Sequence, residues 1–110
     1  MTNIVTKYKR GDSAPPFRAQ LLDNTTPVDL TSATVVRLLM QRPDGTSFAQ
    51  PLTVENQTTN RGWVNRPWGP SDLLLAGSYA VEVEVTWTGG TVQTFPPGGT
   101  ARIIVAPDLG

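Results

Sequence analysis

The chain of 110 residues contains no cysteine and no histidine. Without cysteine it can form no disulfide, and it offers no thiolate nucleophile or zinc–thiolate site. Without histidine it lacks the usual general base near neutral pH and the commonest transition-metal ligand. We therefore expect that the protein is not an enzyme, and we assign no catalytic, cofactor-binding or metal-ligating residue.

An excess of charge and a long apolar run are missing as well. Nine basic and nine acidic side chains cancel, and only Lys7, Lys9 and Arg10 lie close together, too few for a nucleic-acid surface. No apolar run approaches the roughly 20 residues that a transmembrane helix needs. Residues 1–10 lack the apolar stretch of a signal peptide, so nothing in the chain directs secretion. We expect neither nucleic acid nor membrane as a partner.

Turn-forming residues, in contrast, are frequent. Ten glycines and ten prolines recur with other turn signals about every 10 residues, a spacing typical of a β-sandwich. The motif Pro43-Asp44-Gly45 predicts a turn with glycine in the left-handed position. Ser71 or Asp72 can cap one helical turn through Leu73–Leu75. We expect a single all-β domain over residues 1–110.

The segment Ser78–Val92 predicts a β-hairpin. Its apolar residues Tyr79 to Trp87 alternate with polar or small ones, and Gly89-Gly90 supplies a two-residue turn. One face of this strand should meet the core, with Trp87 in it, while Glu82 and Glu84 on the other face should meet water.

The segment 34–42 predicts a central strand. Val36, Leu38 and Met40 share one face, which we expect to be buried. Leu39 lies on the opposite face, and we expect a loop or a partner to cover it.

Three groups of residues are candidates for function. Glu82 and Glu84 lie about 7 Å apart on one strand face, where a solvated surface is the better interpretation than a catalytic pair. Trp63 and Trp68, with Arg66 nearby, can pack in the core, anchor a protein interface or stack on a sugar. The basic N-terminal segment can guard a sheet edge or dock onto a partner. The candidate protein interface comprises Ile4, Val5, Lys7, Tyr8, Lys9, Arg10, Trp63, Arg66 and Trp68.

A series of short motifs spans nearly the whole chain in a fixed order. They are Gly11-Asp12 with Pro15, Leu21-Leu22-Asp23, Pro27-Val28-Asp29-Leu30-Thr31, Ala33-Thr34-Val35, Arg42-Pro43-Asp44-Gly45, Trp68, Asp72, Ala76-Gly77 and Tyr79, the glycine hairpin, Phe95-Pro96 and Ile103-Ile104-Val105. In its order and spacing, this series of motifs resembles the N-terminal domain of siphophage baseplate upper proteins.

This resemblance implies an immunoglobulin-like antiparallel β-sandwich, here with about seven to nine strands and one short helical turn. It implies a non-enzymatic bacteriophage virion structural or adaptor protein that docks onto other tail, baseplate or neck proteins in a symmetric multi-copy assembly. Such a protein is located in the virion, and in the host cytoplasm during assembly. Two alternatives remain open at this point: a capsid decoration protein on the phage head, and a carbohydrate-binding module that uses Trp63 and Trp68.

Overall fold

The computed structural model describes residues 6–109, which form eleven strands and no helix. The strands are β1 (Lys7–Lys9), β2 (Phe17–Gln20), β3 (Leu22–Asp23), β4 (Thr26–Pro27), β5 (Ala33–Gln41), β6 (Ser47–Pro51), β7 (Thr53–Val54), β8 (Trp63–Arg66), β9 (Gly77–Trp87), β10 (Val92–Phe95) and β11 (Ala101–Ala106).

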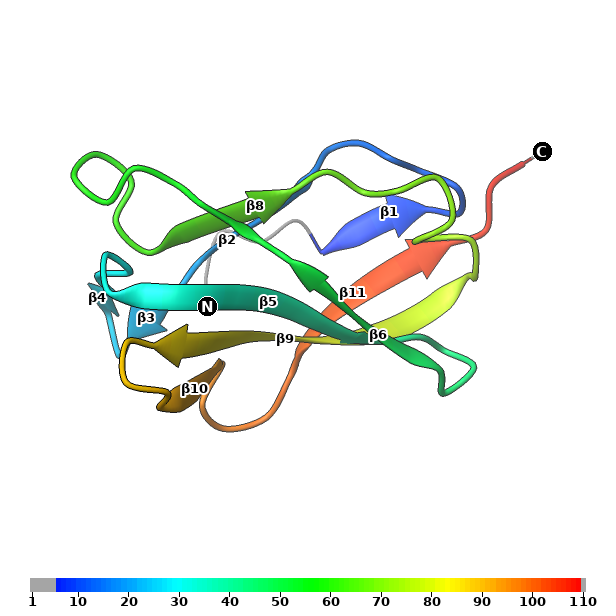
Figure 1. Cartoon of the computed structure of the whole chain (residues 1–110). Helices are drawn as coiled ribbons and strands as arrows, with labels where there is room; N and C mark the ends of the chain where they lie inside the picture. The colour runs from blue at the N-terminus through cyan, green and yellow to red at the C-terminus, as the bar shows by residue number, and fades with distance from the viewer. Residues whose placement is uncertain (1–5, 110) are drawn as a thin grey trace.

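A six-stranded sheet forms one layer of the molecule (Figure 1). Its order is β1-β11-β9-β5-β6, and β10 also pairs with β9. All pairs in this sheet are antiparallel except β1 with β11, in which Lys7 lies beside Ile104 and Lys9 beside Ala106. The parallel pair departs from the purely antiparallel sandwich expected from the sequence.

The second layer is smaller, and its strands β2 and β8 lie above β5 and β9 in Figure 1. It consists of the three-stranded sheet β2-β8-β7, and a separate two-stranded hairpin, β3-β4, lies at one end. The chain crosses between the layers after Pro51, where β6 ends in the large sheet and β7 begins in the small one. Pro51 fits this position because proline cannot donate a ladder hydrogen bond in the middle of a sheet.

The core fills the space between the two layers. Strand β5 contributes Val36, Leu38 and Met40, as their spacing predicted. Strand β9 buries every second side chain, and each of these is fully inaccessible to solvent: Tyr79, Val81, Val83 and Val85. The second layer contributes Phe17, Ala19, Leu21, Val64 and Trp68. Trp87 packs only partly against this core.

The structure confirms an all-β sandwich and corrects two local predictions. Residues 70–73 form a hydrogen-bonded turn, not the expected turn of helix. The reason is that the Asp72 carboxylate accepts hydrogen bonds from the Gly69 N–H and from Arg66, which closes the segment on itself. The hairpin turn has three residues, Thr88–Gly90, since the Trp87 N–H donates to Thr91 O and the Gly90 N–H to Trp87 O.

Strands β10 and β11 pair with the same side of β9, one after the other, and five residues of the chain separate them. Phe95 lies opposite Val83 and Ala101 opposite Val81, so residues 96–100 are all inserted opposite the single residue Glu82. The insertion, Pro96-Pro97-Gly98-Gly99-Thr100, suits an excursion out of a ladder because its two prolines have no N–H to leave unpaired.

Candidate binding surface

The outer face of the six-stranded sheet carries a groove of about 500 Å³. Side chains of β5, β6 and β9 form its floor, and the insertion between β10 and β11 contributes Thr100 to its rim. Its lining includes Leu39, Gln41, Ala49, Ala80, Glu82 and Thr100. We call this surface the outer-face groove.

The floor of the groove follows from the strand register. Leu39 lies between Ala49 on β6 and Glu82 on β9. Because side chains alternate between the faces of a strand, the neighbours of buried Leu38 and Met40 must point outward. Leu39 is therefore held at the surface by the same pattern that fills the core, and small neighbours such as Ala49 and Ala80 leave the floor hollow.

Two carboxylates lie on this face with different surroundings. The Glu84 carboxylate is 2.6 Å from a guanidinium nitrogen of Arg37, its cross-strand neighbour. Glu82 faces Leu39 on β5 and the insertion on the other side. Within residues 6–109, no hydrogen bond or ion pair engages the Glu82 side chain.

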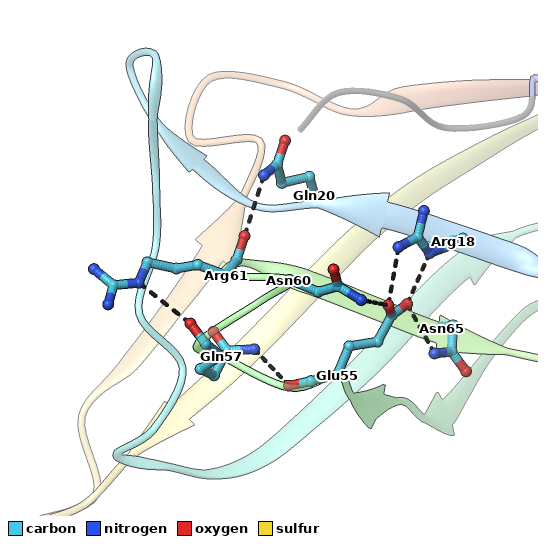
Figure 2. A network of polar contacts seen from close by, with 7 residues as sticks. All are labelled: Arg18, Gln20, Glu55, Gln57, Asn60, Arg61 and Asn65. Atoms are coloured by element: carbon cyan, nitrogen blue, oxygen red, sulfur yellow. Dashed lines mark hydrogen bonds and ion pairs between the residues drawn. The ribbon is translucent and has the colours of Figure 1, made fainter.

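The outer face of the small sheet is polar and is held by a network centred on Glu55 (Figure 2). Arg18 donates two hydrogen bonds to the Glu55 carboxylate, at 2.8 and 2.9 Å. Asn60 and Asn65 donate to the same carboxylate, at 3.0 and 2.9 Å. These donors, with Arg18 first among them, lower the pKa of Glu55 to about 2. All acceptor positions of this group serve the fold, which makes the network a brace for residues 55–62 rather than a binding site.

The low pKa of Glu55 predicts a loss of stability in acid. A carboxylate with a folded-state pKa below its ordinary value of 4.5 stabilises the protein above that value, and this contribution disappears as the pH falls from 4.5 to about 2. We expect Glu55→Gln to lower the free energy of unfolding by about 1–3 kcal/mol at pH 7 and to make the unfolding midpoint less dependent on pH below 4.5.

Urea unfolding of the wild type and Glu55→Gln at pH 7 and pH 3 measures this effect. Part of the acid loss should persist in the variant, because hydrogen bonds from Thr31 and Thr46 lower the pKa of Asp29 and Asp44. Equal acid losses in the two proteins would show that Glu55 is not held as described.

The residues of the predicted N-terminal interface do not form one exposed surface among the described residues. Ile4 and Val5 lie outside the described residues. Tyr8 is buried, with 5% of its surface exposed, and its hydroxyl donates to Pro15 O. Lys7 and Lys9 are exposed on β1, and Arg10 pairs with Asp108 at 2.8 Å. Tyr8 therefore cannot contact a partner, because β1 uses it to anchor the strand to the core.

The structure also separates the two tryptophans. Trp68 is buried against Tyr8 and Phe17, whose ring centroids lie 5.8 and 5.9 Å away. Trp63 is half-buried on the outer face of β8, and the Arg18 guanidinium covers its ring at 3.8 Å. Trp68 is inaccessible and Arg18 covers one face of Trp63, so the two rings do not form the predicted sugar-stacking platform.

Arg66 belongs to the same buried region as Trp68. It pairs with Asp72 at 3.0 Å, and the side chains of both residues are mostly covered. Arg66 therefore closes the turn after β8 instead of offering a charge to a partner.

Sequence reasoning placed Leu39 and Glu82 on the correct face but did not predict the groove. The groove depends on β10 and β11 sharing one side of β9. The signal available in the sequence is Pro96–Thr100, a short Pro- and Gly-rich stretch between two segments with strand character.

The described residues contain no group of three or more carboxylate side chains placed to hold a metal ion. Among residues 6–109 there is also no helix with the length and apolarity that a membrane crossing requires.

Comparison with known proteins yields a structural neighbour and no relative in sequence. No protein-family model and no curated protein matches the chain. The structure is similar to the crystal structure of CopC from Methylosinus trichosporium OB3b, with a TM-score of 0.58 and 10% sequence identity, over 98% of this chain and 89% of that one. At this identity the likeness shows the fold alone.

The expected relationship to siphophage baseplate upper proteins is wrong. The structure is similar to that of CopC, which is not a phage structural protein, and no similarity to a phage baseplate is shown. The roles inferred from that relationship, in tail, baseplate, neck or capsid, are withdrawn with it. The physical reason is that the motifs behind the resemblance are mostly turns, and the same turn chemistry serves many unrelated β proteins.

Proposed function

We propose that this chain is a non-enzymatic protein-binding module, and that an extended segment of a partner protein lies in the outer-face groove. The observation that carries the proposal is the groove itself. Its floor contains the half-buried side chains of Leu39 and Ala80, on a sheet whose other face already packs the core. A sheet face that no element of the fold covers, and that combines apolar side chains with polar ones at its margin, is typical of an interaction surface.

The shape of the groove favours a polypeptide over a small molecule. The groove is open to solvent along the sheet, whereas sites for small molecules are clefts that enclose most of the ligand. Exposed side chains extend the apolar surface along β5 and β11, where Val35 and Ile104 are 47% and 46% exposed. Val35 lies beside Thr86 and Ile104 beside Ser78, near opposite ends of β9, so an extended segment that runs along the strand direction can reach both residues.

The side chains in the groove support binding without catalysis. Glu82 is its one ionisable residue, and general acid–base chemistry ordinarily requires a second group of suitable pKa or a nucleophile beside it. With no histidine or cysteine anywhere in the chain, the common partners for such a carboxylate are missing.

Selection of peptides from a random displayed library tests the proposal. The immobilised wild type should enrich a recurring set of peptides, and Ala49→Arg should enrich none of them because the long side chain fills the floor beside Leu39. The matched control is Ala106→Arg, which makes the same change at an exposed alanine of β11 outside the groove. All three proteins should have the same thermal unfolding midpoint.

Two outcomes would overturn the proposal. One is the absence of any enriched peptide with the wild type. The other is binding that survives in Ala49→Arg; if Ala106→Arg then loses it, binding lies at the β1–β11 side, beside Lys7 and Lys9.

A further inference from the structure

We infer that the segment bound in the outer-face groove carries a lysine or arginine side chain, and that its charged group pairs with Glu82. This inference rests on the proposed function and adds the chemistry of the partner. Its basis is that, of two carboxylates on one strand face, Glu84 has an ion-pair partner within the described residues and Glu82 has none.

Glu82 and Glu84 provide an internal comparison. They are two residues apart on β9 and point to the same side of the sheet. The fold supplies Arg37 to Glu84, directly across the strand pair. It supplies Leu39 to Glu82 at the equivalent position. One carboxylate is neutralised within the sheet, and the other is set against an apolar neighbour.

The insertion between β10 and β11 removes the neighbour that Glu82 would have on its other side. An uninterrupted strand would place one residue opposite Glu82, between the partners of Val83 and Val81. Instead the chain leaves the ladder there and returns at Ala101. Insertions of this kind bend a strand locally and are frequent beside functional sites. The result is a half-buried carboxylate at the floor of a groove.

The cations nearest to Glu82 along the sheet are engaged elsewhere. Arg37, diagonal to it on β5, pairs with Glu84. Arg102, which faces Ala80, directs its guanidinium to the Ser78 hydroxyl at 3.4 Å. The ion pairs among the described residues join Arg10 to Asp108, Arg18 to Glu55, Arg37 to Glu84 and Arg66 to Asp72. The carboxylate of Glu82 is left for a partner.

Covering this carboxylate selects for a cation in the ligand. A carboxylate that loses water without gaining an opposite charge or a hydrogen-bond donor destabilises the complex. Lysine and arginine also carry aliphatic stems, which can lie over Leu39 and Ala80 while the charged end reaches Glu82. An acidic segment would be repelled, so Glu82 discriminates between partners.

The test is a double-mutant cycle on the peptide that the wild type enriches most. Fluorescence anisotropy gives the dissociation constants of the peptide and of its Lys→Gln or Arg→Gln version, for wild type, Glu82→Gln and Glu84→Gln. Glu82→Gln should raise the dissociation constant of the basic peptide about tenfold, the effect expected for loss of a charge-assisted hydrogen bond. It should change the affinity of the neutral version little. Glu84→Gln is the matched control and should show no such coupling.

The outcomes separate this inference from the proposed function. The pairing with Glu82 is overturned if the enriched peptides carry no basic residue, or if Glu82→Gln affects both peptide versions equally. Binding in the groove stands in either case. Coupling to Glu84 instead of Glu82 would overturn it as well. If Ala49→Arg leaves binding intact, or no peptide binds, the proposed function itself fails.

Discussion

Val83→Asp is expected to unfold the domain. Val83 has no solvent-exposed surface, and it lies in β9 between Leu38 on β5 and Phe95 on β10, both of which are buried. An aspartate at this position would hold a charge among hydrocarbon side chains with no cation or donor within the core. Buried unpaired charges belong to the small group of substitutions that cost more than about 4 kcal/mol. That is a large share of the roughly 5–15 kcal/mol by which a small domain is stable.

Circular dichroism and thermal unfolding measure the effect, and the same strand supplies the controls. Glu82→Ala and Glu84→Ala change residues one position away, on the outer face. Glu82→Ala should leave the stability nearly unchanged, and Glu84→Ala should lower it by less than about 1 kcal/mol, since it removes only a surface ion pair. If Val83→Asp is as stable as these two variants, the assignment of faces to β9 is wrong.

This contrast shows which part of the fold a sequence can predict. The alternation in Tyr79–Trp87 determines which side chains of β9 face the same way, because the period of a strand is two. It also follows that Val36, Leu38 and Met40 are buried together. Such local patterns depend only on the chain segment itself, and the structure agrees with them.

Pairings between distant segments were not predictable in the same way. Nothing within residues 92–106 indicates that β10 and β11 follow one side of β9 in succession, or that Glu82 lies opposite their insertion. The parallel pairing of β1 with β11 brings Lys7 beside Ile104, and beyond the two strands Arg10 donates a hydrogen bond to Asp108, 98 positions away. The groove is a product of these long-range pairings, so its position could not be derived from spacing.

The two tryptophans illustrate a second limit. Trp63 and Trp68 are five residues apart, and no local pattern distinguishes the environment of one from that of the other. Trp63 lies within β8 and takes the outward side of the strand, opposite to Val64. Trp68 follows Pro67, beyond the end of the strand, where the chain has left the alternating pattern. The strand end therefore sends one ring outward under Arg18 and the other into the core.

Trp68→Ala is accordingly expected to be the second most disruptive substitution. The ring is 5% exposed and makes edge-to-face contacts with Tyr8 and Phe17, which connect β1 to β2. Its removal leaves a cavity at the junction of the two layers. Substitutions of a buried tryptophan by alanine cost about 3–5 kcal/mol. Trp63→Ala should cost about 1 kcal/mol, mainly the contact with Arg18.

Urea unfolding of Trp68→Ala, Trp63→Ala and Trp68→Phe measures these differences. The Trp68 Nε1–H is buried and has no hydrogen-bond partner among the described residues, so Trp68→Phe retains an aromatic ring while removing an unsatisfied donor. We therefore expect Trp68→Phe to destabilise the domain much less than Trp68→Ala. Were Trp63→Ala the more damaging change, or Trp68→Phe as damaging as Trp68→Ala, the ring of Trp68 would not hold the two layers together by packing.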